Sequence, residues 1–384
     1  MDKIKIAFLT PEYPHSQTGS SGGIGTSIKM LANAMINKGV TVSVLVYGQK
    51  IDALFFDNSI AVYQIKNVKL KGFSRILTQL KISKLINTLY KENKIDVVEA
   101  ADWTGITSFI QPKKCPIIIR LHGSDTYFCK LEKRPVKFLN KFHEKRALIN
   151  ANKIISVSQF TAKQTNQFFR LNKPIQIINN GVNTTFFTND DKLSSNDQII
   201  LYFGTLIRKK GVFELVDIFN KVFEVNSKAK LILIGRDSGD VTTNSKSTWE
   251  LMKPLFSKTS FNNVSYLGKV SYDVMNEYIN RATICVFPSF AEALPVSWLE
   301  AMAMKKAIVA SNIGWGKEII EDGKNGFLVD PKNHALYAEK ILSLLADSNL
   351  RLKIGDEARK KIENCFDINT VVDQNIDFYN MFKR

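Results

Sequence analysis

Short apolar runs alternate with longer amphipathic stretches in this 384-residue chain, and this rhythm restricts its fold more than any other feature. In the first half, runs with the length of buried strands lie at Ile4–Thr10, Val40–Tyr47, Ile60–Ile65, Ile95–Ala100, Pro116–Leu121, Lys153–Val157 and Pro174–Ile178. Stretches of helix length separate several of them: Thr26–Lys38, Arg75–Lys91 and Val136–Asn150. This alternation is typical of a parallel sheet covered by helices, so we predict an α/β fold.

A polar segment at residues 189–198 interrupts the rhythm and is typical of a connection between domains. The alternation then resumes, with strand-like runs at Ile199–Phe203, Lys230–Ile234, Val264–Leu267, Ala282–Phe287 and Ala307–Ala310. Because the chain is too long for one typical core, we predict two Rossmann-like, doubly wound domains, residues 1–185 and 198–366. Residues 367–384 are expected to form a helix that packs back on the first domain. Ligands of such sheets bind beyond the carboxyl ends of the strands, which predicts a site in a cleft between the domains.

The positive charge is concentrated in the first domain. Residues 1–185 hold 27 Lys and Arg against 11 Asp and Glu, whereas the remainder holds 26 against 25. A basic face can serve nucleic acid, an anionic membrane or an anionic substrate, or it can simply aid solubility. Neither zinc-finger spacing nor an aromatic RNA-binding signature accompanies the charge, so we expect no nucleic-acid partner.

Cysteine usage and hydropathy indicate a cytoplasmic protein. The four cysteines are scattered without paired spacing, which is typical of free thiols in a reducing compartment. The amino-terminal apolar run is too short for a signal peptide, and no stretch approaches the roughly 20 apolar residues of a membrane span. An association with the inner face of the cell membrane remains open, because the first domain is basic.

Two glutamates eight positions apart, Glu292 and Glu300, dominate the search for function. The preceding run, Ala282–Phe287, is strand-like, and the sequence from Pro295 onward favours a helix. We therefore expect Glu292 on the loop after a strand and Glu300 about one turn into the following helix. Free N–H groups at a helix start favour phosphate, while carboxylates accept hydrogen bonds from sugar hydroxyls. The alternative is an ordinary capped helix with two solvated glutamates.

A second candidate segment, Gly204–Gly211, follows the first strand of the second domain. It places Arg208, Lys209 and Lys210 in front of a glycine and a helix, which suits a diphosphate. A solvated basic loop is the alternative. Together with the glutamate pair, these cations predict a site for a nucleotide-diphosphate sugar.

The first domain contributes two weaker candidates. Gly22 and Gly23 follow its first strand at the start of a helix, where backbone amides can approach a ligand, although a plain flexible loop has the same sequence. His122 ends a predicted strand and should face the expected cleft, where its ring can contact sugar hydroxyls; a loop histidine bonded to backbone is the alternative.

Several motifs are absent from the sequence. It contains neither an Asp-x-Asp pair that would hold a metal ion on a diphosphate nor a P-loop, and no His/Cys cluster has metal-ligand spacing. We therefore expect metal-independent chemistry without a cofactor, in which protein cations and helix dipoles stabilise a departing diphosphate.

Over essentially its whole length the sequence resembles the retaining glycosyltransferases of family 4 (GT4, the "glycosyl transferases group 1" type), which have the GT-B architecture. The most specific part is Glu292-x7-Glu300 within its Pro-Ser-Phe-Ala-Glu-Ala-Leu-Pro context. Further features in family order are Gly22-Gly23, His122, Asn180–Asn183, Gly204, Lys210-Gly211, Glu318, Gly323 and Gly326.

The resemblance implies a role for each matched residue. Glu292 would contact the donor sugar, Glu300 the nucleotide ribose and Lys210 the diphosphate, with His122 also on the sugar. Glu292, Lys210 and His122 would form the catalytic set. Other expected donor-binding residues are Gly204, Arg208, Ala293, Leu294, Pro295 and Val296, and the loop for acceptor or phosphate is Gly22 and Gly23.

Two departures from the family pattern limit what can be carried over. Thr205 stands where the family often has arginine, and Arg208 could supply the missing charge. Ala293 follows Glu292 where glycine or phenylalanine is common, so the sugar preference cannot be copied.

We therefore expect a retaining transferase that uses a front-face displacement assisted by the leaving phosphate. Its partners would be a nucleotide-sugar donor and a sugar or lipid-linked acceptor, as in cell-envelope polysaccharide or glycolipid assembly, with an anionic membrane as a further partner. The rivals are an inactive sugar-nucleotide-binding subunit and a GT-B sugar-nucleotide epimerase; a phosphorylase would need a lysine-bound pyridoxal site.

Overall fold

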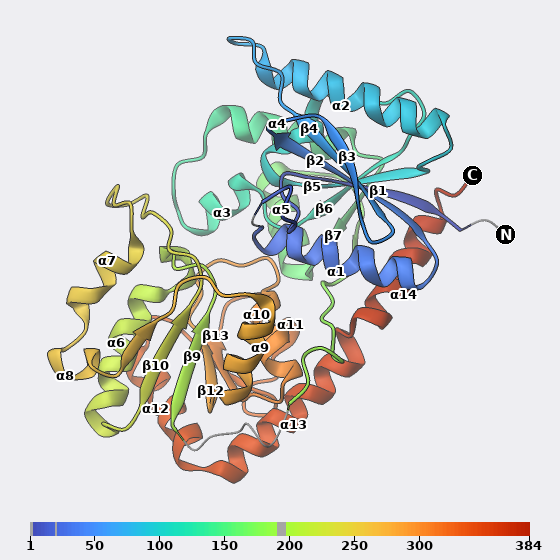
Figure 1. Cartoon of the computed structure of the whole chain (residues 1–384). Helices are drawn as coiled ribbons and strands as arrows, with labels where there is room; N and C mark the ends of the chain where they lie inside the picture. The colour runs from blue at the N-terminus through green and yellow to red at the C-terminus, as the bar shows by residue number, and fades with distance from the viewer. Residues whose placement is uncertain (1–2, 20, 190–196) are drawn as a thin grey trace. The chain divides into compact units, whose positions relative to one another are not determined.

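The computed structural model describes residues 3–19, 21–189 and 197–384. The chain divides into two compact units (Figure 1): unit 1 comprises residues 1–181 and 368–384, and unit 2 comprises residues 182–367. Most of the predicted interdomain segment at 189–198 lies outside the described residues. The chain passes between the units at 181/182 and again at 367/368.

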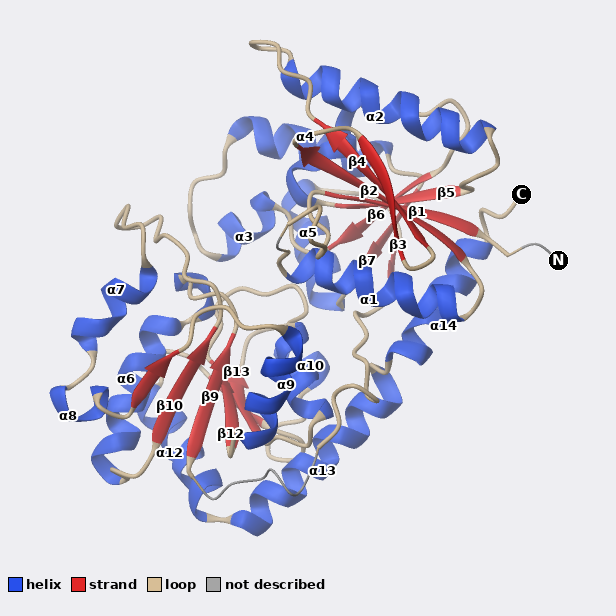
Figure 2. Cartoon of the chain, viewed as in Figure 1, coloured by secondary structure: helices blue, strands red, loops and turns tan. Residues whose placement is uncertain are grey.

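Unit 1 is built on an eight-stranded sheet in the order β3-β4-β2-β1-β5-β6-β7-β8 (Figure 2). Its strands are β1 Lys5–Thr10, β2 Thr41–Gln49, β3 Ala53–Asp57, β4 Ile60–Lys66, β5 Val97–Ala101, β6 Ile117–Leu121, β7 Lys153–Ser156 and β8 Ile175–Ile177. All neighbouring strands pair in parallel except β3, which pairs antiparallel with β4. The interior strands are buried on both faces, as strands between two helix layers must be, and they are largely apolar, with Glu99 in β5 and Arg120 in β6 as the buried charged residues.

The helices of unit 1 cover both faces of this sheet. They are α1 Gly23–Asn37, α2 Ser74–Lys91, the 3₁₀ turn η1 Trp103–Phe109, α3 Asp125–Leu131, α4 Phe138–Asn150, α5 Gln159–Phe169 and α14 Ile368–Asn380. Alternate residues of β1 separate the two layers, since side chains alternate across a strand. Ile6 and Phe8 share a core with α1 and α14, whereas Ala7 and Leu9 share one with α2 and η1.

Unit 2 contains a six-stranded parallel sheet in the order β11-β10-β9-β12-β13-β14. Its strands are β9 Ile199–Phe203, β10 Lys230–Ile234, β11 Val264–Tyr266, β12 Ile284–Phe287, β13 Ile308–Ser311 and β14 Phe327–Val329. Its helices are η3 Arg208–Lys210, α6 Val212–Val225, α7 Thr248–Met252, η4 Lys253–Leu255, α8 Lys258–Phe261, α9 Tyr272–Arg281, α10 Val296–Ala303, α11 Gly316–Ile319, α12 His334–Ala346 and α13 Ser348–Cys365.

The predicted α/β class is confirmed, and every strand proposed from the sequence is present within a few residues. Two strands went unpredicted, β3 at a sheet edge and the three-residue β14. Among the described residues, none of the helices combines the length and the apolar character that crossing a bilayer requires.

Candidate functional site

The candidate site of unit 2 lies where two loops meet at the carboxyl edge of its sheet. One loop follows β9 and the other follows β12, and these two strands are neighbours in the sheet. The backbone amides of Phe290 and Ala291 donate to the carbonyl of Lys209 at 2.8 and 3.3 Å. Gly211 has φ +67°, and a Cβ there would lie only 1.8 Å from the Pro288 carbonyl oxygen. Glycine is therefore required at 211 both by its backbone conformation and by the contact between the loops.

This contact brings Lys210 and Glu292 together across 82 positions of sequence. The Lys210 ammonium lies 2.7 Å from Glu292 Oε1, and the Ser289 hydroxyl donates to the same oxygen at 3.0 Å. Glu292 is buried and Lys210 is half-buried. A cation and a carboxylate thus sit side by side at a strand end, where anions and sugar hydroxyls are commonly bound.

Glu300 is the fifth residue of α10 and is buried. The Tyr272 hydroxyl donates to Glu300 Oε1 at 2.7 Å, and the Tyr272 ring stacks on Phe186. Burial raises the pKa of Glu300 from 4.5 to about 7, although the Tyr272 hydroxyl and the Lys210 charge act in the opposite direction. The carboxylate is therefore poised to ionise near neutral pH, and hydroxyl groups of a ligand would favour its charged form.

The segment between the two glutamates forms the approach to α10. Ala293, Leu294 and Pro295 are buried, Val296 is half-buried, and Pro295 caps the helix without a side-chain hydrogen bond. The first turn of α10 thus follows directly on the loop that carries Glu292. Such a helix start presents backbone N–H groups that suit a phosphate.

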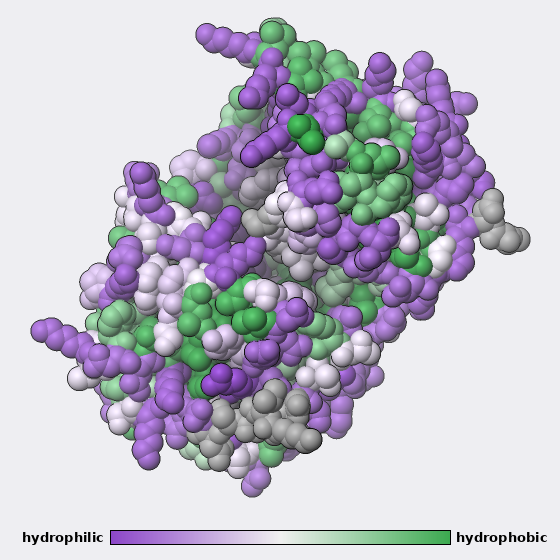
Figure 3. All heavy atoms as spheres, in the orientation of Figure 1, coloured by the Kyte–Doolittle hydropathy of each residue, from purple (hydrophilic) through white to green (hydrophobic). Residues whose placement is uncertain are grey.

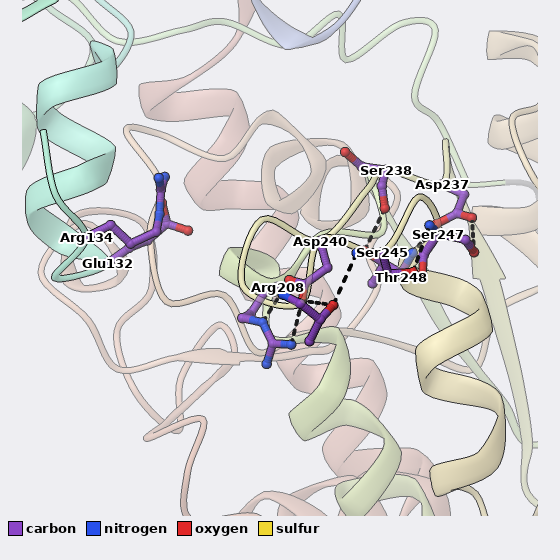
Figure 4. Close-up of polar contacts among 10 residues, drawn as sticks. Glu132, Arg134, Arg208, Asp237, Ser238, Asp240, Ser245, Ser247 and Thr248 are labelled. Carbon is purple, nitrogen blue, oxygen red and sulfur yellow. Dashed lines mark hydrogen bonds and ion pairs between the residues drawn. The ribbon is translucent and has the colours of Figure 1, made fainter. Parts of the chain in front are cut away.

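Gly204 and Arg208 occupy different places in the loop after β9. Gly204 continues the strand, donating from its amide to the Ile234 carbonyl at 2.8 Å. The Arg208 guanidinium binds Asp240 through two nitrogens at 2.9 Å each, as Figure 4 shows, and its plane lies over Phe213. This pairing holds the pKa of Asp240 down, at about 2. Arg208 is therefore engaged with Asp240, and a role on a diphosphate would require it to exchange partners.

In unit 1 the predicted glycine loop holds a carboxylate of its own chain. Glu12 accepts from the amide of Gly22 at 3.0 Å and from that of Gly25 at 3.1 Å, at the start of α1. Gly23 opens the helix, and a Cβ there would meet no atom within 4 Å. The Gly22 amide thus points toward an anion, which here is the Glu12 side chain.

His122 follows β6 and lines a small pocket of unit 1 together with Ser27, Glu99, Arg120, Asn180 and Asn375. Its backbone amide donates to Asp102 at 3.0 Å. Burial and the neighbouring Arg120 charge lower the pKa of His122 to about 3, so the imidazole is neutral at physiological pH. A neutral ring offers one donor and one acceptor, which suits contact with a hydroxyl.

The pocket floor is a buried ionic network. Arg120 pairs with both carboxylate oxygens of Glu99, at 2.7 and 3.0 Å. Asn375 and Tyr379 of α14 also bond to this pair. The helix formed by the residues after 367 therefore completes the buried polar core of unit 1.

One grouping in the described part of the chain could hold a metal ion: Glu214, Asp217 and His334. Glu214 contacts Nε2 of His334, while Asp217 lies 3.7 Å from Nδ1. Since a carboxylate already faces each ring nitrogen, the arrangement fits a polar contact that joins α6 to α12. Cys115, Cys129, Cys285 and Cys365 are all free thiols.

Sequence reasoning missed the residues that support the site from a distance. Tyr272 on Glu300, Asp240 on Arg208 and Glu12 on the glycine loop lie 28, 32 and 10 or more positions away from their partners. No motif links these residues to their partners, so only the fold reveals the contacts.

Comparison with known proteins yields two family models that follow one another along the chain. The model described as "Glycosyl transferases group 1" matches residues 183–361, and the model described as "Glycosyltransferase Family 4" matches residues 21–186.

Individual relatives match over most of their length. An uncharacterised glycosyltransferase of Methanocaldococcus jannaschii is 25% identical over 362 residues, covering 93% of this chain and 93% of the relative. The capsular polysaccharide biosynthesis glycosyltransferase CapM of Staphylococcus aureus is also 25% identical, covering 85% of this chain and 86% of the relative.

Solved structures share the fold. Sucrose-phosphate synthase from Thermosynechococcus elongatus aligns with a TM-score of 0.83 at 19% identity, covering 99% of both chains. Anabaena HepE in complex with UDP-glucose aligns with a TM-score of 0.76 at 19% identity, covering 98% of this chain and 100% of that chain. The predicted fold of two Rossmann-like domains is confirmed by these matches.

Proposed function

Since the chain belongs to the group 1 glycosyltransferases of the GT4 type, we propose that it transfers a sugar, with retention and without a metal ion, from a nucleotide-diphosphate donor to an acceptor. The family and the GT-B fold are those predicted from the sequence motifs. One observation carries the proposal. At the carboxyl edge of the unit 2 sheet, Lys210 from the loop after β9 pairs with Glu292 from the loop after β12, and Glu300 lies in the helix that this second loop enters.

Each member of this group suits one part of a nucleotide-diphosphate sugar. The Lys210 ammonium would neutralise the diphosphate, and the first turn of α10, approached through Ala293–Val296, would add backbone donors. Glu292 would accept hydrogen bonds from the sugar hydroxyls, and Glu300 from the ribose. In the absence of the donor, the contact with Glu292 would hold the Lys210 side chain in place. When the donor binds, Lys210 would turn to the diphosphate and Glu292 to the sugar.

The departing diphosphate is the part of the transition state that most needs stabilisation. As the bond between the anomeric carbon and the phosphate oxygen breaks, negative charge grows on the diphosphate, and a fixed cation stabilises it. The acceptor hydroxyl attacks from the same face and passes its proton to the departing phosphate oxygen, so the configuration is retained. Neutral His122 would bond a sugar hydroxyl, and the Gly22-Gly23 loop would serve the acceptor or the phosphate.

The relatives suggest which substrates to try first. HepE was solved with UDP-glucose, and CapM takes part in capsular polysaccharide biosynthesis. We propose a UDP-sugar donor and an acceptor from cell-envelope assembly, sugar or lipid-linked, used in the cytoplasm at the inner face of the membrane. The excess of basic residues in the first domain supports an anionic acceptor or membrane.

The test combines a donor screen with matched variants. Nucleotide sugars are ranked by the thermal stabilisation they give, and turnover of the best donor is then measured in Lys210→Ala and Glu292→Gln. Loss of a preorganised charge contact should lower turnover by about 10²- to 10³-fold. The control is the exposed pair Glu250 and Lys253, whose 2.6 Å contact lies in the same unit, so Glu250→Gln and Lys253→Ala should leave turnover unchanged. Unchanged turnover in both site variants would overturn the assignment.

The same assay separates the rival functions. An inactive binding subunit would be stabilised by a nucleotide sugar but would never release free nucleotide. An epimerase would change the sugar without an acceptor. Anomeric configuration of the product, read by NMR, tests retention, and turnover in the presence of a chelator tests independence from metal ions.

A further inference from the structure

Two helices of unit 1 carry apolar residues on the side that faces away from the sheet. In α2 the buried residues Ile82, Ile86 and Leu89 face the core. At about 100° per residue, the opposite side is marked by Phe73, Ile76, Leu80 and Lys84. All four are exposed, with Phe73 at 60%. Figure 3 shows green, hydrophobic atoms among purple ones over the amino-terminal end of this helix.

The outward side of α4 repeats this pattern. Ala147 and Leu148 pack into the core, and the opposite stripe consists of Phe138, Phe142, Lys145 and Ile149. These four side chains are exposed, with Phe138 at 80%. A surface helix of a water-soluble protein normally places polar residues there, so two such stripes require an explanation.

Buried polar contacts hold the two helices in one layer. Gln79 of α2 donates to the Ser108 hydroxyl of η1 at 3.1 Å, and that hydroxyl lies 2.7 Å from Nδ1 of His143 in α4. Arg146 of α4 also donates to the Ser108 carbonyl at 2.8 Å. Both helices therefore lie on the same side of the sheet and are fixed to the same turn, and we call their outward stripes together the docking face.

The charge around these stripes has one sign. No Asp or Glu occurs between Asp57 and Glu92, and the single acidic residue of α4, Glu144, is buried, where it accepts from backbone amides. Exposed lysines flank the stripes: Lys69, Lys71, Lys84, Lys133, Lys137 and Lys145. None of these lysines has an ion-pair partner in the part of the chain that the structure describes.

We propose that this docking face, the outward stripes of α2 and α4 with their lysines, binds the surface of an anionic lipid bilayer. Apolar side chains among unpaired lysines match the boundary between acyl chains and anionic headgroups. We favour a bilayer over an acidic protein partner, because the exposed apolar side chains are spread over two helices, with Ile76 and Leu80 on α2 and Phe138 and Phe142 on α4. This inference rests on the proposed function, because it places the acceptor at that membrane. Binding of the protein to vesicles can nevertheless be measured without any sugar transfer.

The experiment is co-sedimentation of the full chain with vesicles of phosphatidylglycerol and phosphatidylcholine, compared with vesicles of phosphatidylcholine alone. We expect binding to the anionic vesicles that weakens with added salt, since surface charges are screened beyond about 10 Å at 0.1 M. The double variants Ile76→Ser/Leu80→Ser and Phe138→Ser/Phe142→Ser should each lower the partition at least tenfold. Lys84→Gln and Lys145→Gln should each lower it about fivefold.

The matched controls are Val225→Ser and Leu352→Ser, which remove equally exposed apolar side chains from unit 2 and should bind as the wild type does. Circular dichroism and stabilisation by the donor confirm that each variant is folded. No binding to anionic vesicles at low salt, or equal loss in the controls, would overturn the proposal. Self-association that the stripe variants abolish, without vesicle binding, would overturn it as well. Failure of donor turnover with intact vesicle binding would instead count against the proposed function alone.

Discussion

Glu300→Gln should make the ligand-free protein more stable above neutral pH. In the folded state burial raises the pKa of this carboxyl from 4.5 to about 7. The unfolded chain therefore releases the proton near 4.5, while the folded chain retains it until about 7. Between these values the folded state binds more protons, so the free energy of unfolding falls as pH rises.

The magnitude follows from the size of that rise. Each tenfold change in an equilibrium constant is worth about 1.4 kcal/mol, so a rise from 4.5 to about 7 corresponds to about 3 kcal/mol. Glutamine keeps the shape and still accepts from the Tyr272 hydroxyl, but it never ionises. The variant should match the wild type near pH 4 and exceed its stability by about 3 kcal/mol at pH 8.

Urea unfolding of both proteins from about pH 4 to about pH 8 measures this difference, provided that the slope of the unfolding free energy against urea concentration is the same in the variant and the wild type. Glu250→Gln, the same substitution at a side chain of unit 2 that is 61% exposed, is the control. A stability difference that is the same at pH 4 and pH 8 would refute the reasoning. The variant should also bind the nucleotide donor more weakly, since the ribose loses a charged acceptor.

Three further outcomes are expected. Gly211→Ala should lower the free energy of unfolding in urea by at least about 3 kcal/mol, because the added Cβ would strike the Pro288 carbonyl oxygen. Gly323→Ala is the control: this residue also has a positive φ, +76°, but open space around it, so the loss should be only about 1 to 2 kcal/mol. Equal losses of stability in the two variants would contradict the close contact at Gly211. Arg120→Met should lower the free energy of unfolding by about 3 to 5 kcal/mol, because it leaves the Glu99 carboxylate buried and unpaired. The double variant Arg120→Met/Glu99→Met should regain much of that stability, which thermal unfolding measures. Asp240→Asn should make the protein less stable above about pH 4, and this difference should shrink as pH falls through the depressed pKa of about 2, so that the unfolding free energies of the two proteins converge in acid.

The strands were predictable because continuous apolar runs mark buried parallel strands. Ile199–Phe203 and Lys230–Ile234 were predicted to the residue. In contrast, β3 at Ala53–Asp57 alternates between exposed and half-buried residues at a sheet edge, so its apolar signal is diluted. β14 is an apolar run of only three residues between Gly326 and Asp330, whereas the equally short β8 and β11 lie within the longer predicted runs Pro174–Ile178 and Val264–Leu267.

The candidate site was predictable in its parts, though its supporting contacts were hidden. The sequence placed Glu292 on a loop and Glu300 in the next helix, and the structure places both there. The contact between Lys210 and Glu292 depends on β9 and β12 being neighbours, and the sequence does not reveal strand order. For the same reason nothing indicated that Asp240 would already hold Arg208.

The buried ionic network of unit 1 affects how this unit can fold during synthesis, because part of it is translated last. Asn375, Val371 and Tyr379 belong to the first unit's core, yet they are translated only after all of unit 2. A nascent unit 1 therefore carries the Arg120–Glu99 pair without two of its buried partners while some 186 residues of unit 2 emerge from the ribosome. Because domains generally fold as units during synthesis, the first half should stay loosely packed until α14 arrives and closes it. Nascent chains halted before and after α14 should accordingly differ sharply in the resistance of unit 1 to protease.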